Sequence, residues 1–341
     1  MSFSDELSNS ILLNECATLK WLEDSDIPTP QLHAYGLRND DSNKAGVAYM
    51  LIDNMEGRPL LHMGPSDTQT RQVYETLASV LSELAKRPLD RIGSLTLMPG
   101  GGTCIGPVIG DRTGTLGLLG AFDSGKSYYV AWCEEHLKLI ADHQLFVRFP
   151  INAYLIFSFL KLQAEKGLWS TVDEVCDAAP FFLKHMDDKG DHILVDDNYN
   201  VTGIIDWTFA RAVPSYEAFG PSLVTADMND MYSGKVRRTD HDEMLASELR
   251  KHDPNITRFA TSPDKIRRLT FSFGSGVDLS WDEALELFKG IMQVFGQGNF
   301  DWDSWSRKAL TEFEKDTRLH SLVSAIKDNP MLVLGDRDSR V

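Results

Sequence analysis

The stretch "FFLKHMDDKGDHILVDDNYNVTGIIDWTFARAVP", residues 181–214, decides the fold. Within it, "HILVDD" and "VTGIIDW" are short apolar runs that the polar turn "DNYN" separates, and this arrangement predicts a β-hairpin. Acidic residues stand just before the first strand and at the end of the second. The hairpin therefore predicts a rigid frame that holds carboxylates at one end of a two-stranded ribbon.

The loop before the hairpin follows the protein-kinase pattern H-R-D-L-x-x-x-N. His185 stands at the His of the pattern, Asp187 at the Asp and His192 at the Asn, while Lys189 lies two positions after the Asp. Asp206 ends the second strand, where kinases keep the Asp that holds Mg²⁺. Phosphoryl transfer needs a carboxylate to orient and deprotonate the attacking hydroxyl, and metal-bound oxygens to offset phosphate charge. We therefore expect the two aspartates to converge on one metal–phosphate centre.

The loop and hairpin resemble the aminoglycoside phosphotransferase and choline-kinase-like family, whose hallmark is similar to "HGDLHPGNILVD…GIIDWE". The segment "NECATLKWLEDSDIPTPQLHAYG" resembles the helix and I-P-x-P strand of that family's N-terminal lobe, and "YMLIDNMEGRPL" resembles its hinge. Three further segments are similar to those of fungal members: "RPLDRIGSL", "FDSGKSYYVAW" and "FARAVPSYEAFGPSL". The resemblance covers nearly the whole chain from Leu12.

This resemblance implies an α+β, protein-kinase-like two-lobe fold with a large helical C-terminal lobe. The N-terminal lobe would be residues 1–55, and the C-terminal lobe would be 56–341, with the catalytic loop at 185–192 and the metal-site hairpin at 193–206. The implied activity is the transfer of a phosphoryl group from ATP, with Mg²⁺, to a hydroxyl of a small-molecule substrate.

The same resemblance implies the roles of the loop residues. Asp187 would be the catalytic base, Lys189 a phosphate contact, and His185 the histidine that braces the catalytic loop by hydrogen bonds. Asp206 would be the main metal ligand and His192 a second one.

For the nucleotide, the resemblance points to the hinge and to the N-terminal helix. The backbone of Asp53, Asn54 and Met55 would face the adenine of ATP. Glu15 stands where the family has the Glu that pairs with a phosphate-binding lysine.

Two departures from the family pattern lead to further expectations. Only fourteen residues precede Glu15, and they contain no lysine, so we expect an incomplete N-terminal lobe without the Gly-rich loop and strand lysine. Either Met1 is an internal start or the chain is a degenerate member, and Glu15 would then be a solvated helix residue. His192 replaces the metal-binding Asn, and imidazole suits Mn²⁺ or Zn²⁺ better than Mg²⁺. The alternative function is therefore a catalytically dead pseudo-kinase that binds a ligand or a protein partner.

The other acids of this stretch have simpler interpretations. Asp191, Asp196 and Asp197 are expected to be turn acids, which accept hydrogen bonds from nearby backbone N–H groups. Asp188 or Asp191 is the alternative candidate for meeting an ammonium group of a substrate.

Composition limits the partners. The formal net charge is −16, which argues against nucleic acid because phosphates are bound largely by Lys and Arg, and which is compatible with a cationic substrate. The longest apolar stretch, "AYLIFSFL", is too short to cross a bilayer, so no membrane partner is expected. Cys16, Cys104, Cys133 and Cys176 stand far apart, which predicts reduced thiols in a cytoplasmic protein.

A competing motif is the octet "GAFDSGKS", residues 120–127, which fits the P-loop spacing G-x-x-x-x-G-K-[ST]. A P-loop NTPase is thus the third functional alternative. The preceding segment "RTGTLGLLG" makes a poor buried strand, however, and a P-loop requires one. We interpret the octet as a loop and helix start that Ser124 or Asp123 caps.

Helical periodicity and glycine content predict the remaining elements. Helices are expected over 5–25, 67–86, 127–142 and 152–166 and over most of the chain after Tyr216, with short hairpins and turns over 92–120.

Overall fold

The structure, a computed structural model, describes residues 4–110, 117–169, 178–275 and 279–328. It has the expected α+β composition of helices and small antiparallel sheets. Contacts divide the chain into two compact units. The first contains residues 1–125, 172–226 and 238–262, and the second contains 126–171, 227–237 and 263–341. The lobe boundary expected at residue 55 stays a prediction.

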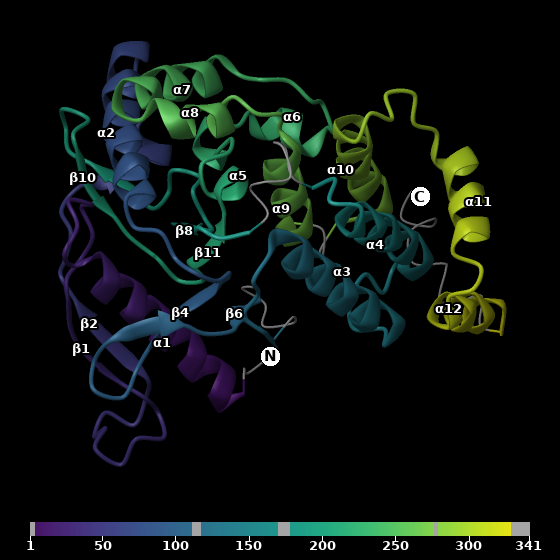
Figure 1. Cartoon of the computed structure of the whole chain (residues 1–341), viewed down its shortest axis with the longest axis horizontal. Coiled ribbons are helices and arrows are strands. Elements are labelled where there is room, and N and C mark those ends of the chain that lie inside the picture. The colour runs from purple at the N-terminus through teal and green to yellow at the C-terminus, as the bar shows by residue number, and fades with distance from the viewer. Residues whose placement is uncertain (1–3, 111–116, 170–177, 276–278, 329–341) are drawn as a thin grey trace, which may run out of the picture. The chain divides into compact units, whose positions relative to one another are not determined.

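The first unit contains all the described strands (Figure 1). The strands are β1 (Leu32–Gly36), β2 (Tyr49–Ile52), β3 (Arg58–Pro59), β4 (Gly93–Leu97), β5 (Thr103–Ile105), β6 (Val108–Ile109), β7 (Leu118–Leu119), β8 (Phe181–Lys184), β9 (Ile193–Val195), β10 (Val201–Ile204) and β11 (Arg211–Pro214). The helices of this unit are α1 (Asp5–Leu22), η1 (Leu60–His62), α2 (Asp67–Ala85), α5 (Ser215–Ala218), η3 (Leu223–Thr225), α7 (Asp240–His252) and α8 (Pro254–Ala260). The expected opening helix, the helix over 67–86 and the hairpins over 92–120 are thus confirmed.

Helix α1 packs against β4 and connects it to the segment after the hairpin. Ser4 caps the helix by accepting a hydrogen bond from the Leu7 N–H at 3.2 Å. The fully buried Asn14 donates from Nδ2 to the carbonyl oxygens of Leu95 and Ala210, at 3.1 and 3.0 Å. Because a buried amide needs such partners, this side chain fixes α1 on the sheet.

The predicted hairpin is present as β9 and β10, with Val195 opposite Val201 and Ile193 opposite Ile204. Asp196 closes its turn by accepting hydrogen bonds from two backbone N–H groups at 2.8 Å, as expected of a turn acid. Strand β3 pairs with the other edge of β9, which gives the sheet order β10-β9-β3.

A second sheet has the strand order β5-β4-β11-β8. Along the chain, its strands β8 and β11 stand directly before and after the hairpin strands β9 and β10. Strand β8 ends at Lys184 and β9 begins at Ile193, so residues 185–192 connect the two sheets. The residues of β11 are all buried, and Phe181 in β8 and Trp207 after the hairpin are among the largest fully buried side chains. The expected catalytic loop is therefore held between rigid elements at both ends.

The second unit is helical, with an aromatic core. Its helices are α3 (Gly125–Ala141), α4 (Pro150–Glu165), α6 (Met228–Tyr232), α9 (Lys265–Ser275), α10 (Trp281–Val294), α11 (Trp302–Glu312) and α12 (Thr317–Asp328). Helix α4 packs against α11 and α12, and α10 packs against α6 and α9. The ring of Phe159 makes edge-to-face contacts with Phe288, Phe295 and Trp305. The expected helical C-terminal part is confirmed.

Two composition-based expectations concern the thiols and membranes. Cys16 and Cys133 are buried free thiols, Cys104 is an exposed one, and Cys176 lies outside the described residues. Within the described ranges, the helices are all too short or too polar to cross a bilayer.

Candidate active site

The loop that joins β8 to β9 turns tightly at Gly190, whose φ of +91° lies in the left-handed region. A Gly is the residue that adopts this conformation without strain. The Gly190 carbonyl oxygen accepts a hydrogen bond from the Leu61 N–H at 3.1 Å, which ties the turn to η1. The turn places Lys189 and Asp191 on either side of the bend, with both side chains near Asp187.

Asp187 is the centre of a dense ionic network. Both of its carboxylate oxygens accept hydrogen bonds from the Lys189 ammonium at 2.9 Å, and Oδ2 also accepts one from His192 Nε2 at 2.9 Å. Its side chain is only 13% exposed. Because short charge-assisted hydrogen bonds are strong, the lysine and the histidine hold this carboxylate in one orientation.

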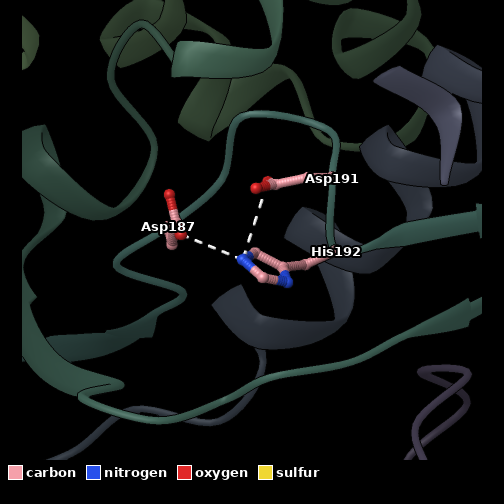
Figure 2. A group of neighbouring side chains, drawn as sticks. All are labelled: Asp187, Asp191 and His192. Carbon is pink, nitrogen blue, oxygen red and sulfur yellow. Dashed lines mark hydrogen bonds and ion pairs between the residues drawn. The ribbon is translucent and has the colours of Figure 1, made fainter. Parts of the chain in front are cut away.

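His192 faces three carboxylates at once, and Figure 2 shows two of them, those of Asp187 and Asp191. Its Nε2 lies 2.9 Å from Asp187 Oδ2, 3.5 Å from Asp206 Oδ2 and 3.6 Å from Asp191 Oδ1. The two aspartates expected to converge, Asp187 and Asp206, therefore both lie within 3.5 Å of one imidazole nitrogen. In this arrangement Nε2 donates its proton to Asp187, so the ring acts as a donor to the acids.

Asp206 adopts a left-handed backbone conformation with φ +58°, which is uncommon for a residue other than Gly. Its neighbours hold the chain there. The Ile205 N–H donates to the His192 carbonyl oxygen at 3.0 Å, and Trp207 Nε1 donates to the Ile204 carbonyl oxygen at 3.0 Å. A strained backbone conformation that neighbouring hydrogen bonds maintain is typical of functional sites, where it orients a side chain.

The His185 side chain connects the backbone at Asp187 to the backbone just before Asp206. The Asp187 N–H can only donate, so His185 Nδ1, at 3.2 Å, is the acceptor. The proton must therefore be on Nε2, which donates to the Ile205 carbonyl oxygen at 2.9 Å. Burial lowers the pKa of His185 below its ordinary value, in agreement with a neutral ring, although the bond to Ile205 opposes the shift. His185 thus braces the loop, as the family resemblance implies.

Glu15 does not lie in solvent, which corrects the expectation for a Glu without its lysine. Its Oε2 accepts a 2.5 Å hydrogen bond from the Thr208 hydroxyl, two residues after Asp206. Burial raises the pKa of Glu15, the Thr208 bond opposes the rise, and the negative charge of Asp206 adds to it. The helix α1 carboxylate therefore supports the backbone that follows Asp206.

The expected hinge residues, Asp53 to Met55, directly follow β2. The Asp53 carboxylate is half exposed and accepts hydrogen bonds from the Gln31 N–H at 3.0 Å and from His33 Nε2 at 2.7 Å. These bonds, the one from Gln31 first, lower the pKa of Asp53. Met55 packs against Gly203 of β10, where an added Cβ would lie 3.0 Å from the Met55 methyl group. The expected hinge segment thus contacts the β9–β10 hairpin, and Asn54, between Asp53 and Met55, is exposed.

The structure places Asp188 and Asp191 differently from each other. Asp188 lies near the Lys184 ammonium at 3.5 Å and accepts a hydrogen bond from the Leu223 N–H, so its carboxylate supports η3. Burial alone would raise the pKa of Asp188, but the Lys184 charge and the hydrogen bonds from Ser222 and Leu223 outweigh it and lower the pKa. Asp191 is not a simple turn acid. Its Oδ2 lies 3.0 Å from Lys189, and its Oδ1 faces His192.

The third expected turn acid, Asp197, is exposed and forms an ion pair with Arg58 at 2.6 Å.

An apolar cavity of about 80 Å³ lies beside the loop within the first unit. Its lining includes Leu84, Leu183, His185, Trp207 and Leu245. The rings of His185 and Trp207 meet edge to face with centroids 4.9 Å apart. The loop therefore rests on an apolar base that has some unfilled space.

The octet "GAFDSGKS" has a different setting from a P-loop. The strand before it, β7, has two residues, pairs antiparallel with β6, and leaves Leu118 39% exposed. Helix α3 begins at Gly125, and Asp123 accepts a hydrogen bond from Arg91 Nε at 2.8 Å. A P-loop follows a buried strand, so this geometry agrees with the interpretation as a loop and helix start. The capping role of Ser124 or Asp123 stays a prediction.

Comparisons with known proteins place this geometry in a family. The model of the phosphotransferase enzyme family matches residues 11–220, a segment that contains the whole loop 185–192 and the β9–β10 hairpin. A curated relative, the clavilactone A biosynthesis cluster protein Y of Ampulloclitocybe clavipes, is 26% identical over 224 residues, which are 63% of this chain. The chain spans about half the length, 53%, of that relative.

Solved structures of similar shape include two ternary complexes. A thermostable mutant of an aminoglycoside phosphotransferase with AMP-PNP and hygromycin B is 16% identical, with a TM-score of 0.44 and coverage of 84% of this chain and 83% of that chain. The APH(2″)-IIa complex with streptomycin and ATP is 12% identical, with a TM-score of 0.43 and coverage of 85% and 81%. The family match itself covers well over half of the residues and includes every member of the ionic network. This chain therefore belongs to the phosphotransferase enzyme family.

Proposed function

We propose that the protein transfers the terminal phosphoryl group of ATP to a hydroxyl of a small molecule. The observation that carries this proposal is the convergence of Asp187 and Asp206 on His192 Nε2, at 2.9 and 3.5 Å. Asp187 lies in the loop that leads into β9, and Asp206 lies two residues after β10, so one hairpin connects the two carboxylates. Because this chemistry depends mainly on positioning and electrostatics, such a frame is what it requires.

Asp187 would orient the substrate hydroxyl and accept its proton. The Lys189 ammonium now neutralises this carboxylate, and its side chain is 36% exposed, so it has room to turn toward a phosphate. When Lys189 does so, Asp187 loses one partner and becomes a stronger acceptor. The same lysine would then offset negative charge on the transferred group.

The residues fit a magnesium ion in part. Carboxylate oxygens are the ligands that Mg²⁺ prefers, and Asp206, which is 42% exposed, offers them at the site. When bound, Mg²⁺ would neutralise negative charge on the phosphates. The imidazole of His192 fits Mg²⁺ poorly, and Nε2 carries a proton toward Asp187. We therefore assign Asp206 as the main ligand, and His192 as a ligand only after it gives up that proton.

The backbone of Asp53 to Met55 would meet the adenine ring. The contact between Met55 and Gly203 supports this proposal, because it connects the hinge segment to the hairpin that carries Asp206. The substrate is proposed only as a hydroxyl compound. The acidic charge of the chain makes a cationic one a suitable first choice.

The test is an ATP-dependent phosphorylation assay on a panel of aminoglycosides and uncharged alcohols, with Asp187→Asn as the variant. We expect the variant to lose about 100- to 10,000-fold in rate, the range for removal of a general base. Asp197→Asn on the same hairpin is the matched control, because that exposed aspartate pairs only with Arg58 among the described residues. Equal rates for wild type and Asp187→Asn would reject the proposal.

A second candidate is a non-catalytic protein that binds a ligand in the same place. It is favoured by the engagement of Asp187 by both Lys189 and His192, which leaves the carboxylate neutralised in this conformation. Thermal stabilisation by millimolar Mg-ATP would argue against loss of nucleotide binding. A Lys126→Ala variant tests the P-loop alternative in the same experiment, since only that alternative predicts loss of nucleotide binding.

A further inference from the structure

Asp187, Asp191 and His192 form a compact ligand set. One ligand atom of each of the three lies within 4.8 Å of the other two. Figure 2 shows both carboxylates directed toward the same ring nitrogen of His192, Nε2. Asp206 is not a member of this set, although it also approaches His192.

The spacing is close to that of a tetrahedral zinc site. Ligand bonds of about 2.0 Å in tetrahedral geometry place two donor atoms about 3.3 Å apart. The His192 nitrogen lies 2.9 Å from one carboxylate oxygen and 3.6 Å from the other, so the two distances bracket this value. All three ligand atoms lie within 4.8 Å of one another, so a movement of at most about 1.5 Å brings the most distant pair to this spacing.

Asp191 provides an independent sign of a missing partner. Its Oδ1 is buried, and it has no hydrogen-bond partner among the described residues. A buried carboxylate oxygen without a hydrogen bond is costly, even though the Asp191 side chain as a whole is 26% exposed and its Oδ2 is paired with Lys189. This oxygen is the one that faces His192 at 3.6 Å. A cation between them would satisfy it.

We propose that Asp187, Asp191 and His192 bind Zn²⁺, and that the bound ion inhibits the protein by occupying its base. The nitrogen ligand and the small number of ligands favour zinc over Mg²⁺. Binding replaces the proton that His192 now shares with Asp187, and it displaces the Lys189 ammonium from both acids. The inhibition rests on the proposed phosphotransfer, whereas the binding does not.

Isothermal titration of the full chain, freed of metal with a chelator, measures Zn²⁺ binding directly. We expect one high-affinity ion per chain. Asp191→Asn and His192→Gln should each weaken it at least about tenfold, because even indirect supports of metal ligands are worth this much. Asp197→Asn is the matched control and should bind like wild type. Unaltered affinity in both site variants would place the ion elsewhere and overturn the proposal, as would the absence of binding to wild type.

A Lys189→Met variant should change the affinity for Zn²⁺ in the opposite direction. Zn²⁺ must displace the ammonium that lies 2.9 Å from Asp187 and 3.0 Å from Asp191, so removal of this competing charge should tighten binding. Weaker binding by this variant contradicts the assigned site. All three variants remain interpretable if circular dichroism shows the wild-type helix content.

The kinetic arm separates this proposal from the proposed function. If wild type phosphorylates a hydroxyl substrate, Zn²⁺ should inhibit it competitively with that substrate, and Asp191→Asn should need at least about tenfold more Zn²⁺. If no substrate is phosphorylated, the proposed function fails while the calorimetric result still decides the metal site. Inhibition that is equal in wild type and Asp191→Asn would refute the inhibitory role.

Discussion

Replacement of His185 by Phe tests whether the hydrogen bonds of the His185 ring stabilise the site. The wild-type ring accepts a hydrogen bond from the Asp187 N–H and donates one to the Ile205 carbonyl oxygen. Phenylalanine supplies neither, so a buried donor and a buried acceptor would both lose their partner. Each such group costs about 1–3 kcal/mol. We expect the free energy of unfolding to fall by about 2–6 kcal/mol.

The change in packing energy should be small compared with the cost of losing these two hydrogen bonds. The cavity of about 80 Å³ beside His185 gives the larger ring space, and the contact with the Trp207 ring can be kept. Exposed His252, at the end of α7, is the matched control. His and Phe have similar helix propensities, so His252→Phe should change stability by less than about 0.5 kcal/mol.

The pH dependence of the same variant gives a second, independent check. The pKa of His185 is lowered by burial in the folded state, whereas in the unfolded chain it is about 6.5. Below about pH 6.5 the unfolded wild type binds a proton that the folded state excludes, so wild-type stability falls as the pH falls toward the folded pKa. His185→Phe lacks this contribution, so the gap between the two proteins should narrow on acidification.

Urea unfolding at several pH values measures this gap, and hydrogen exchange of the β9–β10 amides shows whether the loss is local to the hairpin. A His185→Phe variant within about 0.5 kcal/mol of wild type, the range of ordinary surface substitutions, would refute the bracing role. A gap that does not change with pH would refute the buried neutral ring.

Three further predictions concern the frame of the site. Glu15→Ala should lower the free energy of unfolding by about 1–3 kcal/mol, because it removes a buried hydrogen-bond acceptor, while Glu15→Gln keeps an acceptor and should cost less, as urea unfolding would show. Gly93→Ala should cost at least about 2 kcal/mol in the same assay, since its Cβ would lie 2.2 Å from the Gly106 carbonyl oxygen, whereas Gly120→Ala has open space and should be harmless. Asp188 has a lowered pKa, so its contribution to stability should be present above about pH 4 and lost as the pH falls through its folded pKa; Asp188→Asn should flatten the acid limb of a stability–pH curve.

The elements that surround the site follow from local patterns in the sequence. The hairpin is encoded by two apolar runs around a turn in which Asp196 caps the backbone, and α2 by apolar residues at helical spacing. These signals concern residues close together in the chain, where spacing determines which side chains share a face. The loop-to-hairpin spacing also predicted that Asp187 and Asp206 converge, and both carboxylates lie within 3.5 Å of His192 Nε2; the metal–phosphate centre itself stays a prediction.

The contacts that sequence reasoning missed depend on distant segments or on one backbone angle. Glu15 meets Thr208 across 193 positions, and no periodicity within α1 indicates that partner. Asp191 joins the ligand set because the chain reverses at Gly190 with a positive φ, which turns the carboxylate inward. The glycine of "DKGD" was the available signal, since Gly marks positions where a chain reverses.

The charges of the loop explain why His192 can stand where the family pattern has Asn. Asp187, Asp191 and Asp206 would repel one another if they were held together alone, and the cost would fall on the hairpin. Lys189 contacts two of these acids, and the proton on His192 Nε2 is directed at the same cluster. The lysine and the histidine therefore offset the repulsion among the carboxylates through the hydrogen bonds that they donate. The Zn²⁺ ion that we propose would take over this role at the same nitrogen, because zinc accepts imidazole ligands whereas Mg²⁺ prefers oxygen.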